Sequence, residues 1–353
     1  MSLLPRIRSS AEDFVVEEIP LYTPCGEGEH TYLWIEKTLR TTEEVARELS
    51  RIAEVHSRDV GYAGRKDRGA VTRQWFSVRG LDVAGAEDLD LRGARVLEAG
   101  LHRNKLRTGH LAGNRFELVV RDVDEARLAT ARERLDELSA SGMQNRFGNQ
   151  RFGRDGENAA RALALLRGEA APGPGKASSS KRSRGRARND RRDQRFLMSA
   201  LQSAVFNDFL AERELPESEL ELGDVAIVHE SGGMFVVEDL PVEAARAAAF
   251  EISPTGPLFG TKMMTAEGAV GEREAALIER WGIPAAGELV APRGVRLRGA
   301  RRPLRVRIDA PSLSSGEPGV AKLTVTLPPG SYATVLLEEL FGEFSEGPPA
   351  AVS

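Results

Sequence analysis

Residues 61–76 of this 353-residue chain read GYAGRKDRGAVTRQWF. The segment predicts two strands joined by a loop, in which Gly64 permits a tight turn of the backbone. Asp67 stands in this loop between Lys66 and Arg68, and both cations favour the ionised form of its carboxylate. A charged carboxylate on a short, stiff side chain can act as a nucleophile or stabilise a positive charge. A Lys-Asp-Arg sequence is also common in ordinary surface turns, so its neighbours decide how Asp67 is interpreted.

The residues that follow the loop favour a functional interpretation. Thr72, Arg73, Gln74 and Trp75 place a hydroxyl, a guanidinium, an amide and a ring directly after the carboxylate. Side chains of these kinds contact the bases and phosphates of nucleic acids.

A second polar segment, GMQNRFGNQRFGR, spans residues 142–154. An asparagine such as Asn145 can read a base edge, and the ring of Phe147 can stack on an unpaired base for ~1–3 kcal/mol. The alternative is a turn whose aromatic rings fill the core, and it stays open for both Phe147 and Phe152.

The remaining patterns predict an α+β architecture, with helices packed on a mixed or antiparallel sheet. Thr41 and Glu44 predict a capping box for a helix that we expect to reach about His56. Val45, Leu49 and Ile52 would form its buried face. Strands are expected over residues 14–19, 31–36, 59–63, 74–78, 116–120 and 323–327, and further helices over residues 124–139, 196–213 and up to Phe341.

A change of composition marks a domain boundary after residue 170. The sequence AAPGP is followed there by a Ser- and Arg-rich tract, which cannot bury enough apolar surface to fold alone. We expect a second compact unit to begin after this tract and to run to about Arg302.

The net charge of −4 does not by itself indicate a nucleic-acid partner. Residues 176–195, however, hold nine Lys or Arg against Asp190 and Asp193, and residues 101–115 and 289–308 hold no carboxylate. Because exposed charges are screened beyond ~10 Å, such basic tracts can attract a polyanion locally. Alternatively, the 176–195 tract is only solvated surface or a disordered linker.

Several classes of protein are disfavoured. No run approaches the ~18 apolar residues of a membrane helix, and the N-terminus lacks a secretory signal pattern. Cys25 is the only cysteine, which fits a reducing, cytoplasmic location. The five histidines show no metal-ligand spacing, and no nucleotide-binding motif is present, so we expect neither a metal nor a cofactor.

The two polar segments and several others resemble motifs of the TruD family of tRNA pseudouridine synthases. The family's E-D-F-x-V stands at residues 12–16 and G-E-G-E-H at residues 26–30. A-G-x-K-D-x-x-A-x-T-x-Q spans residues 63–74, K-L-R-x-G-x-L-x-G-N-x-F residues 105–116, N-x-F-G-x-Q-R-F-G residues 145–153, and G-S-[FY]-A-T residues 330–334. The motifs occur in order over nearly the whole chain.

The resemblance implies a pseudouridine synthase catalytic fold with an inserted, family-specific α/β domain. Residues 1–169 and 307–353 would form the catalytic domain. Residues 170–306 would form the insert, beginning with a flexible basic segment at about residues 172–195. The implied activity is isomerisation of uridine 13 of tRNA to pseudouridine. We expect a monomer, because no long heptad or exposed apolar stripe stands out.

The resemblance also implies roles for individual residues. Asp67 would be the catalytic aspartate, Phe147 the ring that stacks on the target base, and Asn145 its polar neighbour. Arg8 stands where the family usually has lysine, and we expect it to pair with Asp67. Phe14 and Tyr332 would be further substrate contacts, and Lys66, Thr72 and Gln74 would support the Asp67 loop.

Three other functions compete with this interpretation. The first is a non-catalytic RNA-binding protein of the same fold, which the complete loop motif argues against. The second is an enzyme acting on free nucleosides, and the basic tracts favour a polymeric substrate instead. The third is a scaffold protein without a site, which leaves both polar segments unexplained.

Overall fold

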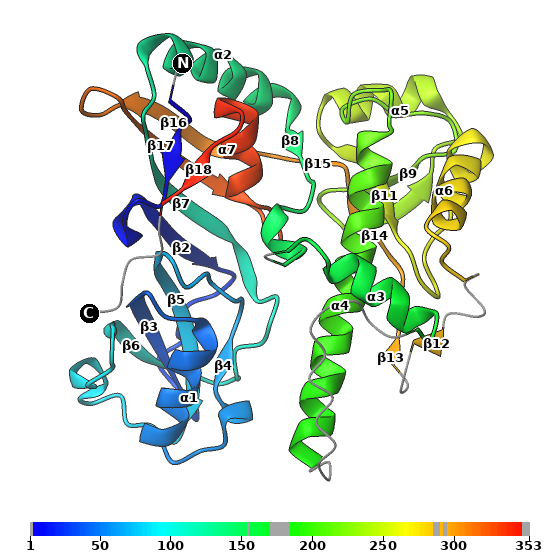
Figure 1. Ribbon diagram of the computed structural model, residues 1–353. Coiled ribbons are helices and arrows are strands. Elements are labelled where there is room, and N and C mark those ends of the chain that lie inside the picture. Colours follow the sequence, from blue (N-terminus) through cyan, green and yellow to red (C-terminus); the bar gives the residue numbers. More distant parts are fainter. Residues whose placement is uncertain (1–2, 154, 170–183, 285–289, 292–294, 348–353) are drawn as a thin grey trace. The chain divides into compact units, whose positions relative to one another are not determined.

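The computed structural model describes residues 3–153, 155–169, 184–284, 290–291 and 295–347 (Figure 1). The chain divides into two compact units, one formed by residues 1–140 and 307–353 and the other by residues 141–306. The chain therefore leaves the first unit once and returns to it once. None of the described helices is long and apolar enough to cross a lipid bilayer.

A ten-stranded mixed sheet is the framework of the first unit, and its main strand order is β16-β17-β7-β2-β5-β3-β6. Strand β2 pairs with β5 in parallel and with β7 antiparallel, so both orientations meet in the middle of the sheet. The strands are β1 (Arg6–Ile7), β2 (Phe14–Pro20), β3 (His30–Thr38), β4 (Gly61–Tyr62), β5 (Val71–Arg79), β6 (Ala94–His102), β7 (Leu111–Arg121), β16 (Asp309–Ser315), β17 (Val320–Leu327) and β18 (Ser345–Glu346).

Helices α1 (Thr42–Ile52), α2 (Glu125–Ser141) and α7 (Ala333–Phe341) accompany this sheet. The capping box predicted for α1 is confirmed, because Thr41 and Glu44 each accept a hydrogen bond from the other's backbone N–H. Val45 and Leu49 are buried in one cluster with apolar residues of β3 and β5, such as Leu33 and Phe76. Burying side chains of this size contributes ~1.5–3 kcal/mol each. The α+β class is confirmed.

Two details of the first unit differ from the sequence-based expectation. Helix α1 ends at Ile52 and not near His56, because Glu54 has a φ of +52°, which a continuing right-handed helix cannot include. Ile52 is 39% exposed and therefore does not belong to the buried face. Strands β6 and β16, which lie at the two ends of the main strand order, were not predicted. Val96 is the only buried residue of β6 and β16 has none, so the apolar alternation of both strands is weak.

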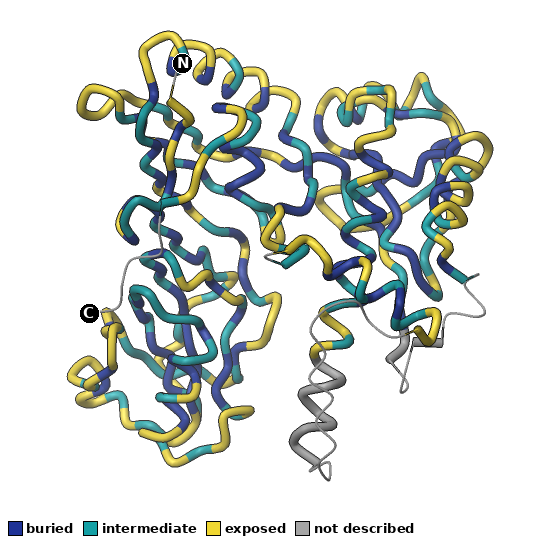
Figure 2. The backbone as a smooth tube through the Cα atoms, in the orientation of Figure 1, coloured by how far each residue is buried: buried dark blue, intermediate teal, exposed yellow. Residues whose placement is uncertain are grey.

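The second unit is built on a four-stranded antiparallel sheet of order β10-β9-β11-β14. Helix α4 packs on β11 with a buried face that includes Leu201, Val205 and Phe206 (Figure 2). The elements are β8 (Met143–Gln144), α3 (Asn158–Leu166), α4 (Arg184–Ala211), β9 (Val225–Val228), β10 (Met234–Val236), α5 (Leu240–Ala248), β11 (Ile252–Leu258), α6 (Gly268–Arg280), β12 (Val290–Ala291), β13 (Val295–Arg296), β14 (Ala300–Pro303) and β15 (Arg305–Val306).

Residues 141–169 belong to the second compact unit, whereas the family resemblance implies that they are part of the catalytic domain. Which domain these residues serve functionally stays a prediction. Of the basic segment expected over residues 172–195, the part up to residue 183 lies outside the described residues. From Arg184 onward the backbone is helical, so α4 begins well before Phe196, where the apolar periodicity starts.

Candidate active site

Asp67 lies in the loop that joins β4 to β5, and 50% of its side chain is exposed. Arg8 Nη2 donates a hydrogen bond of 3.0 Å to Asp67 Oδ2, which forms the ion pair expected from the sequence. Only 16% of the Arg8 side chain is exposed, so solvent screens this pair less than a pair of fully exposed charges. Asp67 thus presents a carboxylate to solvent while a fixed cation holds one of its oxygens.

Arg8 occupies a strained position directly after β1. Its φ of +53° lies in the left-handed region, which costs a non-glycine residue ~1–2 kcal/mol and is often found at functional sites. The guanidinium carbon lies 4.1 Å from the centroid of the Phe14 ring, in cation–π contact. Phe14 is 3% exposed and packs edge to face on Phe116. Arg8 therefore joins the predicted substrate contact Phe14 to the predicted catalytic carboxylate.

The backbone of Asp67 is held by Lys37, a residue of β3 that is 1% exposed. Lys37 Nζ donates to the carbonyl oxygen of Asp67 at 3.0 Å and to that of Arg40 at 2.6 Å. Burial lowers the pKa of Lys37 to about 8, although the negative charge of Asp67 acts in the opposite direction. The ammonium group thus ties the Asp67 loop to the end of β3.

Lys66 does not pair with its neighbour Asp67. Its side chain turns inward, where Nζ lies 3.4 Å from Glu18 Oε2 and donates to Asn114 Oδ1. Burial lowers the pKa of Lys66 and raises that of Glu18, while the attraction between the two charges opposes both shifts. Arg68 pairs with Glu44 at 3.7 Å. Lys66 and Arg68 therefore form their ion pairs with other carboxylates, and Arg8 forms the ion pair with Asp67.

Gln74 and Thr42 fix the first half of the loop. Gln74 Nε2 donates to the carbonyl oxygen of Gly64 at 3.0 Å, and Gln74 Oε1 accepts from Thr42 Oγ1 at 2.8 Å. The same hydroxyl oxygen accepts from the backbone N–H of Lys66 at 2.9 Å. Gln74 and Thr42 are both buried, so this chain of hydrogen bonds stiffens the loop on the side that faces the protein interior.

The other two residues singled out after the loop, Arg73 and Trp75, make contacts within the protein. Arg73, suggested as a phosphate contact, pairs at 2.9 Å with Glu17 and with Glu36. Trp75 is 5% exposed and packs in the core beside Tyr32. Because Arg73 is ion-paired and Trp75 is buried, the structure does not support the prediction that these two side chains contact nucleic acid.

Tyr332 lies at the N-cap of α7 and is half-buried, shortly after β17 ends at Leu327. Leu327 is paired with Asn114, the residue that also binds Lys66, so the sheet brings the G-S-Y-A-T motif to the strand ends near the loop. Within the described part of the chain, buried hydroxyl oxygens of Thr72, Ser331 and Thr334 have no hydrogen-bond partner. Buried polar groups are nearly always hydrogen-bonded, so each of these three hydroxyl groups can still bind a water molecule or a ligand.

Asn145 and Phe147 belong to the second unit, and both are buried there. Arg302 donates from Nη2 to Asn145 Oδ1 at 2.5 Å, and its guanidinium carbon lies 4.0 Å from the Phe147 ring centroid. The Phe147 ring also packs edge to face on Phe206, with centroids 5.6 Å apart. Asn207 exchanges two hydrogen bonds with the Phe147 backbone. The structure thus gives both residues a rigid setting.

The sequence predicted roles for Asp67, Arg8 and Gln74, but it did not predict that Lys37 and Asn114 bind residues of the Asp67 loop. Lys37 belongs to no motif, and nothing in its neighbourhood distinguishes it from an ordinary strand lysine. Asn114 lies inside the K-L-R-x-G-x-L-x-G-N-x-F motif, so its motif position could have drawn attention to it. Only the sheet register reveals that these residues meet at the loop.

Comparison with known proteins extends this picture. The family model "tRNA pseudouridine synthase D (TruD)" matches residues 3–171 and 187–340. Proteins called tRNA pseudouridine synthase D are similar over 95% of this chain: one from Geobacter metallireducens at 40% identity (94% of its own length), one from Anaeromyxobacter dehalogenans at 44% (92%) and one from Thermus thermophilus at 42% (88%).

The fold has a counterpart among solved structures. The crystal structure of a protein from Methanosarcina mazei, described there as TruD, superposes with a TM-score of 0.75 at 24% sequence identity. The match covers 98% of this chain and 95% of the other. Since the family model covers most of the chain and the relatives are similar from end to end, the chain belongs to the tRNA pseudouridine synthase D (TruD) family.

Proposed function

We propose that this protein isomerises uridine to pseudouridine in tRNA, at position 13, and that Asp67 is the catalytic carboxylate. One observation carries the assignment to Asp67. Its carboxylate is half exposed and paired with Arg8, while its backbone is held by the buried ammonium of Lys37. A reactive group on a rigid support is what catalysis requires, because a displacement of ~1 Å can cost ~100-fold in rate.

The reaction breaks the bond between N1 of uracil and C1′ of the ribose and forms a bond between C5 and C1′. The hydrogen of C5 is lost as a proton and N1 gains one, so atoms and electrons balance without a net oxidation. Asp67 either attacks C1′ or removes the 2′ proton, and both roles need the ionised carboxylate. The cation of Arg8 forms an ion pair with the carboxylate and orients it.

The target nucleotide has to leave its helical stack, which costs a few kcal/mol. We assign Phe147 to stack on the base, which would recover part of this cost, and Asn145 to contact its edge. Phe14 and Tyr332 are proposed as further substrate contacts. Lys66, Thr72 and Gln74 are proposed to support the loop and not to touch the substrate.

The remaining proposals concern the whole protein. We propose that it acts on tRNA as a monomer in the cytoplasm and uses no cofactor. The functional division is proposed to follow the catalytic domain of residues 1–169 and 307–353 and the insert of residues 170–306.

The decisive experiment replaces Asp67 by asparagine, which keeps the shape of the side chain but removes its charge. Release of tritium from tRNA labelled at C5 of uridine should fall to background, while tRNA binding and thermal stability stay close to those of the wild type. Asp136→Asn, an exposed position on α2, is the matched control and should turn over normally. Turnover by Asp67→Asn would refute the assignment of Asp67, and absence of product from the wild type would refute the activity.

A further inference from the structure

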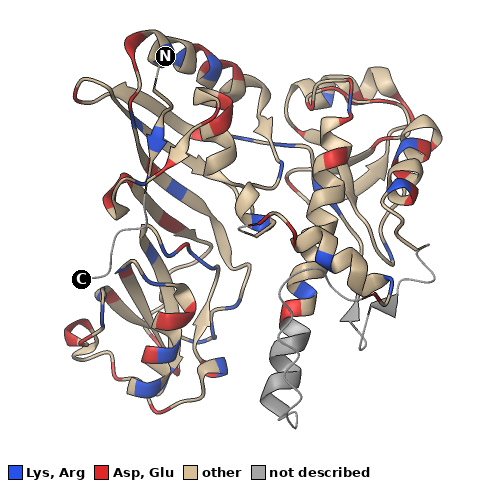
Figure 3. Ribbon diagram, in the orientation of Figure 1, with Lys and Arg blue, Asp and Glu red and all other residues tan. Residues whose placement is uncertain are grey.

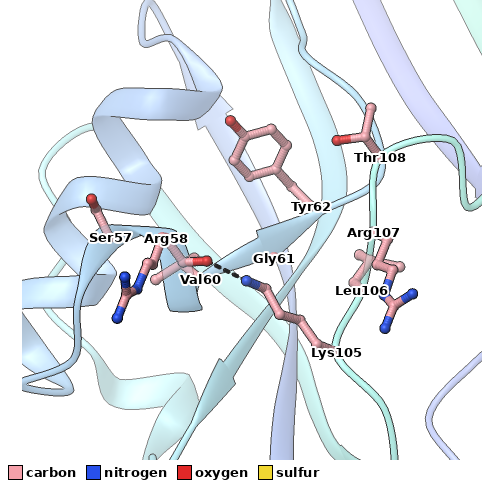
Figure 4. A pocket seen from close by; sticks show the side chains of 9 residues that line it. All are labelled: Ser57, Arg58, Val60, Gly61, Tyr62, Lys105, Leu106, Arg107 and Thr108. Atoms are coloured by element: carbon pink, nitrogen blue, oxygen red, sulfur yellow. Dashed lines mark hydrogen bonds between the residues drawn. The ribbon is translucent and has the colours of Figure 1, made fainter. Parts of the chain in front are cut away.

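Acidic and basic residues are interspersed along the described elements of both units (Figure 3). One pocket of the first unit differs, because its nine lining residues include Arg58, Lys105 and Arg107 but no carboxylate. Its volume is about 410 Å³, within the ~300–1,000 Å³ range of small-ligand sites. The side chains of Ser57, Tyr62 and Thr108 add three hydroxyl groups (Figure 4).

The wall of this pocket is built from two backbone segments in direct contact. A Cβ atom at Gly61 would lie 2.3 Å from the carbonyl oxygen of Leu106 and 2.4 Å from Ser77 Oγ, so only glycine fits. Ser77 Oγ accepts a hydrogen bond from the backbone N–H of Leu106 at 2.9 Å. The basic loop of residues 105–108 is thus fixed against β4.

The three cationic side chains differ in the partners that they bind within the protein. Lys105 Nζ donates to the carbonyl oxygen of Arg58, which anchors its charge in the pocket (Figure 4). Arg107 has no side-chain partner in the part of the chain that the structure describes. Arg58 Nε lies 3.9 Å from Asp59 Oδ1, and both side chains are exposed, so this ion pair contributes little to stability. Two guanidinium groups are therefore available to an anion.

The pocket is also close to Asp67 along the chain. Tyr62 lines the pocket and is followed, five residues on, by Asp67. Five residues span at most ~18 Å, even when fully extended. A ligand in the pocket and a nucleotide at Asp67 can therefore belong to one stretch of the same polymer.

We propose that this pocket binds a backbone phosphate of the substrate RNA, with Arg58 and Arg107 as its ligands and Lys105 as a fixed positive charge. Arginine suits this role because its planar fork donates two parallel hydrogen bonds to phosphate oxygens. Ser57 and Thr108 supply uncharged donors beside them. The proposal rests on the proposed function, since it takes the phosphate from the tRNA whose uridine reaches Asp67.

The test measures tRNA binding to the full-length protein as a function of salt, which needs no turnover. Arg58→Gln combined with Arg107→Gln should weaken binding roughly tenfold at moderate salt. It should also reduce the slope of log K against log salt by about 0.7, because the pocket is proposed to hold one phosphate and each phosphate contact contributes ~0.7 on a single strand. The KM for tRNA should rise while kcat at saturating tRNA is retained.

Two control proteins separate a specific contact from a general loss of charge or of folding. Arg127→Gln combined with Arg132→Gln removes the same charge from α2, which Figure 1 draws at the opposite end of the first unit from β4, and should leave the slope unchanged. Arg58→Lys combined with Arg107→Lys keeps the charge and should restore most of the slope.

Equal slopes for the Gln pair at the pocket and the Gln pair on α2 would overturn the proposal. A fall in kcat without a rise in KM would do so as well. These outcomes are independent of the proposed function, which fails only if the wild type makes no pseudouridine or if Asp67→Asn remains active.

Discussion

The ammonium group of Lys37 donates a hydrogen bond of 3.0 Å to the main-chain carbonyl oxygen of Asp67. Its second bond reaches the carbonyl oxygen of Arg40, so one buried cation joins the end of β3 to the loop. The bond acts on the backbone of Asp67 and leaves its carboxylate free to face solvent and Arg8. We therefore propose that Lys37 is a positioning residue, which acts on the reaction through Asp67.

Lys37→Met keeps a long apolar side chain but removes the donors. The carbonyl oxygens of Arg40 and Asp67 then lose a buried partner, at a cost of ~1–3 kcal/mol, part of which the removal of a buried charge offsets. We expect a small loss of stability but a fall of more than tenfold in the single-turnover rate, because the loop is no longer held. Lys322→Met, at an exposed position of β17, is the control. A normal rate for Lys37→Met would show that the bond does not position Asp67.

The same lysine predicts a pH dependence of stability. Burial lowers the pKa of Lys37 from its ordinary 10.5 to about 8, against the opposing effect of Asp67. Between these values the unfolded chain binds the proton and the folded chain does not, so the contribution of Lys37 to the free energy of unfolding rises with pH. At ~1.36 kcal/mol per pH unit, the wild type should gain about 3 kcal/mol relative to Lys37→Met between pH 8 and pH 10.5. Urea unfolding of both proteins measures this difference, and parallel curves would contradict it.

The sequence predicted the helices and strands better than the contacts between residues that lie far apart along the chain. The helix start at Thr41 follows from a capping box, β2 from its branched residues and β3 from alternation, because these signals lie within a few residues. The contact between Lys37 and Asp67 depends on how β3 pairs with β5, and a register of this kind is set by the whole sheet. The partner of Lys66 was missed for the same reason, since Glu18 comes from β2.

Arg8 tests whether the ion pair with Asp67 contributes to the rate. Arg8→Ala removes the cation that orients the carboxylate and uncovers the Phe14 ring, so we expect a fall of roughly 10- to 100-fold in kcat/KM. Arg8→Lys keeps a positive charge within reach and should retain most of the rate, with a lower stability because the flat contact with the ring is lost. Steady-state kinetics and thermal unfolding of the two variants separate these effects. Similar rates for Ala and Lys would show that the charge is not used.

Gly61→Ala tests the backbone contact beneath the basic pocket. The added Cβ would meet the carbonyl oxygen of Leu106 at 2.3 Å, and a main-chain atom cannot move aside as a side chain can. Overpacking of this kind costs ~1–3 kcal/mol, so the melting temperature should fall by several degrees. Gly69→Ala has no atom within 4 Å of the new Cβ and should melt close to the wild type. Equal melting temperatures for the two variants would show that β4 and residues 105–108 are not in contact.

Phe147→Ala addresses whether this ring serves the substrate or only the core. Phe147 is 8% exposed and its ring packs on Phe206, so removal of the ring should cost about 3 kcal/mol in stability whatever its function. Phe206→Ala removes a fully buried ring from the same contact and is the matched control. If Phe147 stacks on the target base, Phe147→Ala should lose far more of the single-turnover rate than Phe206→Ala, while both bind tRNA almost as the wild type does. Equal losses of rate, or a collapse of tRNA affinity in Phe147→Ala, would make the ring a structural residue.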